Sequence, residues 1–105
     1  MEHVEISCEV NKFSDQFLEQ VAELFKLLAH PQRLRLLEVL ARKKELAVHE
    51  LIAELGLAQP CVSQHLNRMR RMGLVAGSRR GKEIYYSISD ERALSILNCM
   101  QGKKS

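Results

Sequence analysis

The sequence lacks both a long apolar run and the layout of a signal peptide. A membrane-spanning helix needs about 18 or more apolar residues in succession, and no such run occurs among the 105 residues. The first residues, Met-Glu-His-Val-Glu, do not show the charged and then apolar order of a secretory leader. We therefore expect a cytoplasmic protein that contacts no membrane.

Cysteine is also scarce, and its spacing excludes several chemistries. The three cysteines, Cys8, Cys61 and Cys99, are odd in number and widely separated. They fit neither a disulfide framework nor a C-x-x-C metal or redox motif. The sequence also offers no nucleophile with a spaced base, no phosphate-binding loop and no paired carboxylates, so we expect no enzyme. Reduced thiols are the default expectation.

Positive charge is concentrated at one end of the chain. The total of 16 Lys and Arg against 13 Asp and Glu gives a net charge of only +3. From Gln59 to Lys82, however, there are six basic residues and no acidic one. Such an asymmetric distribution favours a polyanionic partner for that end of the molecule.

The pattern along the chain predicts a flexible arm over residues 1–12, one domain over 13–101 and a polar tail over 102–105. Ser14 can cap a helix that runs to about Ala29. The apolar residues of this helix cover more than half of its circumference. We interpret the broad arc as two packing surfaces, one for its own domain and one for a partner subunit. The alternative is a central helix that is buried on all sides.

The remaining pattern predicts a winged helix-turn-helix domain, mainly α with a two-stranded β-wing. Further helices are expected over about 31–42, 48–55 and 59–72, with Gly56 and Gly73 as terminators. Two short helices joined by a tight turn form the helix-turn-helix motif. Residues 74–80 and 83–88 favour a hairpin. Ser89 can cap a last helix, which is too short to be stable unless it docks on the first helix of the same or the partner chain.

The helix over 59–72 carries the predicted DNA-reading face. With Val62, Leu66 and Met69 buried, the opposite side presents Pro60, Gln64, Asn67, Arg68 and Arg71, with Cys61 and Ser63 on its flanks. Gln and Asn pair with adenine, and Arg pairs with guanine or phosphate. Arg79, Arg80 and Lys82 at the hairpin tip add contacts to the DNA backbone. The alternative is an ordinary solvated helix face.

Four segments resemble the ArsR/SmtB regulators: Leu27–Leu37, Glu45–Leu51, Gln59–Leu66 and Gly81–Tyr86. The resemblance covers about residues 14–100. It implies five helices with a β-wing after the fourth, a homodimer joined through the first and last helices, and repression of a double-stranded DNA operator that an inducer relieves. A two-fold protein binds an imperfect palindrome. The positions that match the family's DNA-reading segment are Gln59, Pro60, Cys61, Ser63, Gln64 and His65. Ala58 departs from the Ser or Thr that usually caps this helix.

Two metal sites common in the resembling family are absent from the sequence. Ala47-Val48-His49 stands where arsenite sensors have a Cys-Val-Cys-type pair. In the last helix Asp90 matches one zinc ligand, but Arg92 stands where a His is expected. A site built from His3, Cys8, His49 and Glu50 is an open alternative. Beyond that alternative, these positions predict no cofactor.

The cysteines provide a different hypothesis for the inducer. The family places the N-terminal arm and the last helix side by side, which would bring Cys8 and Cys99 together. A soft metal, a trivalent metalloid or a reactive sulfur species bound by their thiolates would then act as the signal. Cys61 lies at a helix N-terminus, which favours thiolate. The alternatives are a regulator that senses a small organic ligand and a nonregulatory architectural DNA-binding protein.

Overall fold

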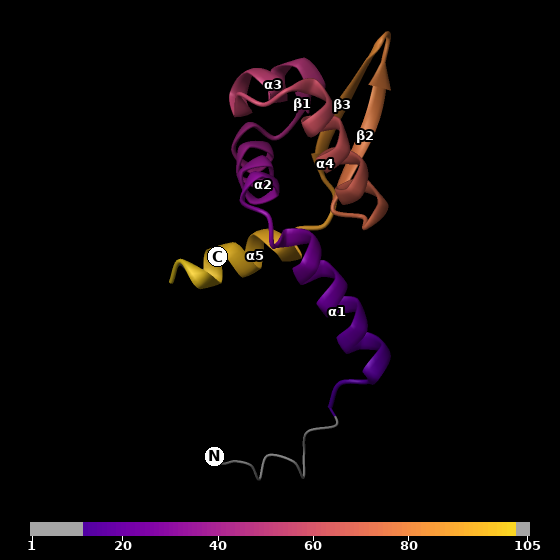
Figure 1. The fold of residues 1–105 in the computed structure, drawn as a ribbon, viewed down its shortest axis with the longest axis vertical. Helices are drawn as coiled ribbons and strands as arrows, with labels where there is room; N and C mark the ends of the chain where they lie inside the picture. Colours follow the sequence, from indigo (N-terminus) through magenta and orange to yellow (C-terminus); the bar gives the residue numbers. More distant parts are fainter. Residues whose placement is uncertain (1–11, 103–105) are drawn as a thin grey trace.

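The computed structural model describes residues 12–102, which form five helices and a small sheet. The elements in chain order are α1 (Asp15–Leu28), α2 (Pro31–Lys43), β1 (Leu46–Ala47), α3 (Val48–Leu55), α4 (Gln59–Arg71), β2 (Val75–Arg80), β3 (Glu83–Ile88) and α5 (Arg92–Met100). Figure 1 shows α2, α3, α4 and the hairpin as one body, with α1 extending away from it. This order confirms the predicted winged helix-turn-helix fold.

Side chains fix the starts of the first two helices. The Ser14 hydroxyl accepts a hydrogen bond from the backbone N–H of Phe17 at 3.0 Å, as the sequence predicts. In α2, Pro31 occupies the first turn, and Nδ1 of His30 accepts from the backbone N–H of Gln32 at 3.3 Å. Proline suits this position because its missing N–H has no intrahelical partner there. The chain therefore breaks between α1 and α2 at His30.

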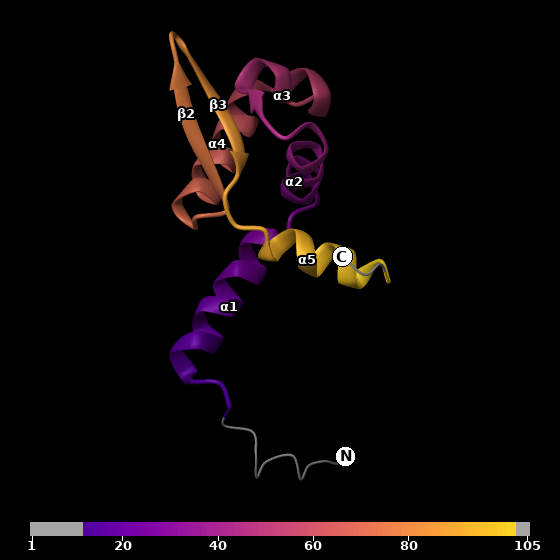
Figure 2. The same cartoon turned by 180° about the vertical axis from the view of Figure 1, so that it is seen from behind.

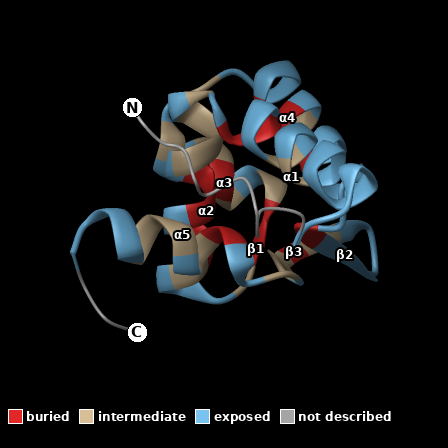
Figure 3. Cartoon of the chain, turned by 90° about the horizontal axis from the view of Figure 1, so that it is seen from below, coloured by how far each residue is buried: buried red, intermediate tan, exposed pale blue. Residues whose placement is uncertain are grey.

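The hydrophobic core lies between α2, α3, α4 and the base of the hairpin. Its largest fully buried side chains are mostly leucines. They lie on α2, α3 and α4, in the turn after α4 and at the start of β2: Leu36, Leu37, Val39, Leu40, Leu51, Val62, Leu66, Met69, Leu74 and Val75. Figure 3 shows buried segments on α2, α3 and α4, and a largely exposed outer side of α4. The core thus supports α4 from one side and leaves its other side open.

The sheet has three antiparallel strands in the order β1-β3-β2, one more than the sequence predicts. Strands β2 and β3 form the predicted hairpin, with Val75 opposite Ile88 and Arg80 opposite Glu83. β1 is a two-residue strand that pairs Leu46 with Tyr86. Two residues are too few to show the alternation by which strands are recognised in a sequence.

The predicted Ser89 cap of the last helix is wrong. Helix α5 begins at Arg92, and its N-terminal Glu91 makes no side-chain capping bond. The Ser89 hydroxyl instead donates to the carbonyl oxygen of Gly73 at 2.7 Å, and its backbone N–H donates to Leu74 O at 2.9 Å. Ser89 therefore joins the end of the hairpin to the turn after α4.

Helix α1 leaves the body of the domain, as the two opposite views in Figures 1 and 2 both show. At its C-terminal end Leu27 and Leu28 are buried in the core, whereas Phe17, Leu18 and Phe25 are exposed by 42%, 47% and 51%. Within one chain the helix is therefore not buried on all sides. Between residues 12 and 102, no helix has the length and hydropathy that crossing a membrane requires.

Candidate nucleic-acid interface

The turn between α3 and α4 sets the direction of α4. Helix α3 ends at Gly56, whose φ of 69° lies in the left-handed region that glycine tolerates. Its start is fixed by Glu50, whose carboxylate accepts from the backbone N–H of Ala47 at 2.8 Å. Ala58 offers no side-chain cap, yet α4 begins at Gln59, with Pro60 in its first turn. The missing cap is therefore offset by proline and by packing.

The outer side of α4 carries the polar residues that the sequence places there. Val62, Leu66 and Met69 are almost completely buried and hold the helix against the core. The opposite side is exposed at Gln59, Pro60, Cys61, Gln64, Asn67, Arg68 and Arg71, whereas Ser63 is half-buried. The face is thus formed as predicted, and its contacts with DNA stay a prediction.

His65 does not belong to this exposed face, which corrects the prediction that it contacts DNA. Only 7% of the residue is exposed. Nε of Arg33 donates to its Nδ1 at 3.0 Å, and its Nε2 lies 3.2 Å from Oε1 of Gln32. Because an arginine Nε–H can only donate, Nδ1 is the unprotonated nitrogen and Nε2 donates to Gln32. Both ring nitrogens are therefore used within the protein, and His65 positions α4 against α2.

The environment of His65 keeps its ring neutral. Burial lowers the pKa of His65 most strongly, and the nearby His30, Arg33 and Arg68 lower it further. The His30 ring meets it edge-on, with 4.6 Å between ring centroids. A proton on Nδ1 would remove the acceptor for Arg33 and place a second cation beside it. The hydrogen-bonded arrangement therefore requires neutral imidazole.

Arg33 in α2 connects α1 and α4, a role that no feature of the sequence predicts. Its Nη1 donates to the backbone carbonyl of Leu27 in α1 at 2.9 Å, while its Nε holds His65 in α4. A histidine near the buried side of α4 implies a hydrogen-bond partner. Nothing local identifies that partner, because Arg33 lies 32 positions earlier in the chain.

The three basic residues of the wing differ in how far they are already engaged. Nη2 of Arg80 lies 2.5 Å from Oε2 of Glu45, and its guanidinium stacks 4.7 Å from the centroid of the Tyr85 ring. Arg79 makes only a long bond, 3.5 Å, to the carbonyl of Gly81. Arg79 and Lys82 are exposed at the tip. These two are therefore better placed than Arg80 to meet a phosphate.

The residues suggested as a metal site do not converge where the structure describes them. Nδ1 of His49 lies 3.5 Å from Oε2 of Glu83, and Glu50 caps α3. His3 and Cys8 lie outside the described residues. Across residues 12–102 no three His, Cys, Asp or Glu side chains gather closely enough to hold a metal ion.

Asp90, which precedes α5, forms an ion pair with Arg92 at the start of that helix. The carboxylate of Asp90 accepts from the backbone N–H and the guanidinium of Arg92, with Nη2 at 2.6 Å. These hydrogen bonds lower the pKa of Asp90. Cys99, farther along α5, and Cys61, at the start of α4, both have free, exposed thiols. The thiols are accessible, whereas Asp90 is already paired.

Comparisons with known proteins agree with this geometry. The family model described as "Bacterial regulatory protein, arsR family" matches residues 30–76. The transcriptional repressor PagR of Bacillus anthracis is 40% identical over 90 residues, which cover 86% of this chain and 90% of PagR. Its crystal structure superposes with a TM-score of 0.74 over 83% of this chain and 99% of that one.

Two further solved structures are similar. The AntR antimony-specific transcriptional repressor is 31% identical, with a TM-score of 0.79 over 97% of this chain and 93% of that one. A homodimeric winged helix-turn-helix DNA-binding domain from Mycobacterium bovis is 32% identical, with a TM-score of 0.74 over 87% and 86% of the two chains.

Proposed function

The chain belongs to the ArsR family of bacterial regulatory proteins, and from that membership we propose that it is a cytoplasmic repressor that binds an imperfect palindrome as a homodimer. It is a DNA-binding transcriptional regulator and not an enzyme. In this proposal each subunit reads one half-site, and an inducer releases the operator. The two-fold symmetry of such a dimer matches the two-fold symmetry of a palindrome.

The exposed face of α4 carries the proposal. A helix supported on one side by a leucine core and open on the other fits the major groove of DNA. We assign base contacts to Gln59, Ser63, Gln64 and Asn67, backbone contacts to Arg68, Arg71, Arg79 and Lys82, and weaker backbone contacts to Arg80, with Pro60 and Cys61 at the groove-facing start of α4. His65 is left out of this set because it is buried.

Dimerisation is assigned to α1 and α5. Phe17, Leu18 and Phe25 on α1 and Met100 on α5 are large apolar side chains exposed to solvent in the single chain, Met100 by 81%. Large apolar side chains left without cover at several positions of two helices favour a surface that packs against another protein. A related domain is homodimeric in solution. A second copy of the chain is therefore the proposed cover for these side chains.

Selection of binding sites from random double-stranded DNA tests the proposal. The expected result is an imperfect palindrome whose half-sites lie one helical turn, or a multiple of it, apart. If no motif is enriched and unrelated duplexes bind equally well, the protein is an architectural DNA-binding protein.

A pair of variants tests whether α4 recognises bases while the wing contacts the DNA backbone. Gln64→Ala should mainly relax the base preference at one position of each half-site, at a cost of about 1–3 kcal/mol on the preferred sequence. Arg79→Gln should weaken binding to all duplexes equally. Equal losses on selected and random DNA for Gln64→Ala would disprove the base contact.

For the inducer we propose thiol chemistry at Cys8 and Cys99. Cys61 is a third thiol, beside the proposed DNA surface, whose modification would block DNA binding directly. The exposure of Cys99 and Cys61 supports access by an inducer, and the similar AntR is antimony-specific. Trivalent metalloids and soft metals favour thiolate ligands. A sensor of a small organic ligand is the competing possibility.

Native mass spectrometry with antimonite, arsenite and a persulfide donor tests the thiols, together with reporter induction in cells. The double variant Cys8→Ser/Cys99→Ser should lose the adduct that bridges the two thiols and the induction that depends on it, while Cys61→Ser keeps both. Unchanged induction of the double variant would disprove the role of Cys8 and Cys99. Absence of induction of the wild type by all three compounds would favour an organic ligand.

A further inference from the structure

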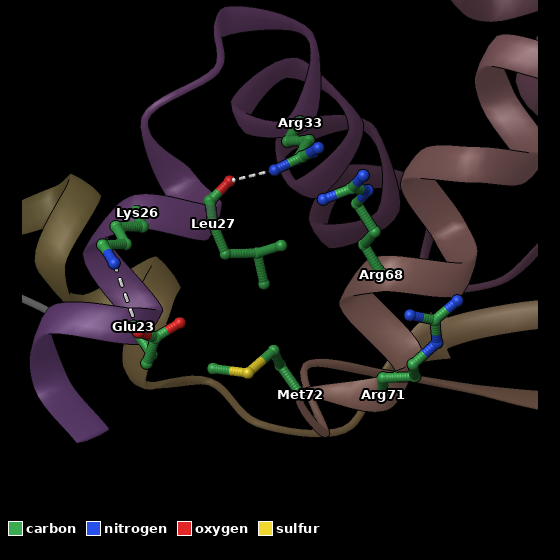
Figure 4. A pocket seen from close by; sticks show the side chains of 7 residues that line it. All are labelled: Glu23, Lys26, Leu27, Arg33, Arg68, Arg71 and Met72. Atoms are coloured by element: carbon green, nitrogen blue, oxygen red, sulfur yellow. Dashed lines mark hydrogen bonds and ion pairs between the residues drawn. The ribbon is translucent and has the colours of Figure 1, made fainter. Parts of the chain in front are cut away.

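Three helices border a hollow of about 410 Å³ that is open to solvent on the flank of α4. The end of α1, the start of α2 and the second half of α4 form its walls (Figure 4). Leu27 and Met72 extend into it from opposite sides. The other lining residues are charged: Glu23, Lys26, Arg33, Arg68 and Arg71.

The charge around the hollow is strongly unbalanced. Its one carboxylate, Glu23, is paired with Lys26 at 3.3 Å. Among residues 12–102 no carboxylate lies within ion-pair distance of Arg33, Arg68 or Arg71. Burial, and then repulsion from Arg68, lower the pKa of Arg33. Two guanidinium groups therefore face the same space without a counter-ion from the described part of the chain.

We propose that this hollow is a binding site for a phosphoryl oxyanion, held between the guanidinium groups of Arg33 and Arg68 with Arg71 at the rim. Guanidinium groups bind phosphate through paired N–H donors. Arg33 is already held in place by the Leu27 carbonyl and by His65, so little conformational freedom remains to be lost on binding.

The phosphoryl group has two sources with the same chemistry: a free phosphorylated small molecule, or one phosphate of the DNA backbone. The second source rests on the proposed function, and the first does not. In either case the anion would neutralise the repulsion between Arg33 and Arg68. Because Arg33 joins α1 to α4, a bound anion would also stabilise the junction of these helices.

The first experiment uses the full chain and free anions. Inorganic phosphate and pyrophosphate are titrated at constant ionic strength against chloride, and the backbone amide shifts of Leu27 and Met72 are followed by NMR. Saturable shifts with a raised unfolding temperature are expected. Arg68→Gln should weaken binding by about 10-fold or more. Arg70→Gln removes an equal charge from the same helix, outside the hollow, and should bind like the wild type.

The second experiment tests DNA as the source. Single methylphosphonate substitutions remove the charge of one backbone phosphate at a time in a duplex that the wild-type protein selects. One position should weaken wild-type and Arg70→Gln binding by about 10-fold, and have no further effect on Arg68→Gln.

Saturation by free anions in the first experiment or this coupling in the second supports the site and identifies its source. Absence of both overturns the proposal. The side chain of Arg68 makes no hydrogen bond within the described residues, so its substitution should leave the fold intact. A thermal unfolding curve checks this. Selection of a palindrome by the wild-type protein is unaffected by the result, which separates failure of this site from failure of the proposed function.

Discussion

The domain has two regions that treat their apolar side chains differently. In α2, α3, α4 and the base of the hairpin, the large apolar side chains point inward, and most of the leucines are almost completely buried. In α1 and α5, much of the apolar surface stays in contact with water, as at Phe17, Phe25 and Met100. The first region holds the proposed DNA-reading helix, and the second carries the proposed dimer interface.

This difference indicates that stability and assembly are carried by separate sets of residues. A small domain buries a smaller fraction of its surface than a large one, so a chain of this size gains from association. The exposed face of α1 leaves apolar side chains in contact with water in the single chain. In the proposed dimer, burial of this face would contribute favourable free energy to association. The two regions meet at Arg33, which bonds both Leu27 and His65.

The largest expected effect comes from the buried region. Leu66→Ala removes a side chain that is 1% exposed and should lower the free energy of unfolding by about 2–5 kcal/mol, because it leaves a cavity. Urea unfolding at one protein concentration measures this loss. Leu18→Ala, the same change at a residue that is 47% exposed in the single chain, should cost clearly less when the protein concentration is low enough for the protein to be monomeric. Similar losses for both variants would break the distinction between the regions.

A charge on α1 should affect assembly more than folding. Phe25→Glu should raise the dissociation constant of the dimer by about 100-fold or more, because each interface would bury two unpaired carboxylates in place of two phenyl rings. Sedimentation measures the monomer fraction. Gln16→Glu, which adds an equal charge to an exposed position on the same helix, is the control. A dimer that tolerates Phe25→Glu would exclude this face from the interface.

The free energy of unfolding should depend on pH through His65, which lies at the junction between the two regions. The pKa of His65 is lowered in the folded protein, so below about 6.5, the ordinary value, the unfolded chain takes up a proton that the folded one does not. The contribution of neutral His65 to the free energy of unfolding is therefore fully present above about pH 7. It is lost as the pH falls from 6.5 through the lowered pKa.

Urea unfolding between pH 7.5 and 5 measures this dependence. In the wild type, the free energy of unfolding should decrease by up to about 1.4 kcal/mol for each unit by which the pH falls within that window. The dependence should weaken in His65→Gln and remain in His49→Gln, in which the substituted histidine is exposed. An equal pH dependence in His65→Gln and the wild type would show that His65 does not control it.

The smallest effect is expected at the wing. Arg79→Gln should reduce the slope of log K against log salt concentration by about 2, as expected when each subunit of the proposed dimer loses one phosphate contact. Arg80→Gln should reduce it less, because Glu45 and Tyr85 already engage that guanidinium. Filter binding over a range of salt concentrations compares them. A larger effect of Arg80 would indicate that it leaves Glu45 when DNA binds.

Most elements could be predicted because their signals are local. Ser14, Pro31, Gly56 and Gly73 start or end helices through the conformation of a few neighbouring residues, and the structure places the helix boundaries beside them. The Ser89 cap failed because that hydroxyl bonds to Gly73, 16 residues away. A residue suited to capping caps a helix only if no tertiary partner competes for it.

The sequence alone determined the winged helix fold, the exposed polar face of α4 and the concentration of positive charge at one end, because periodicity, turn residues and charge order are properties of neighbouring positions. Only the tertiary structure decided which of those polar residues are available. It buried His65 between Arg33 and Gln32, paired Arg80 with Glu45, and brought Arg33 and Arg68 around one hollow. These contacts join residues more than 30 positions apart, so they depend on how the helices pack and have no local pattern that predicts them.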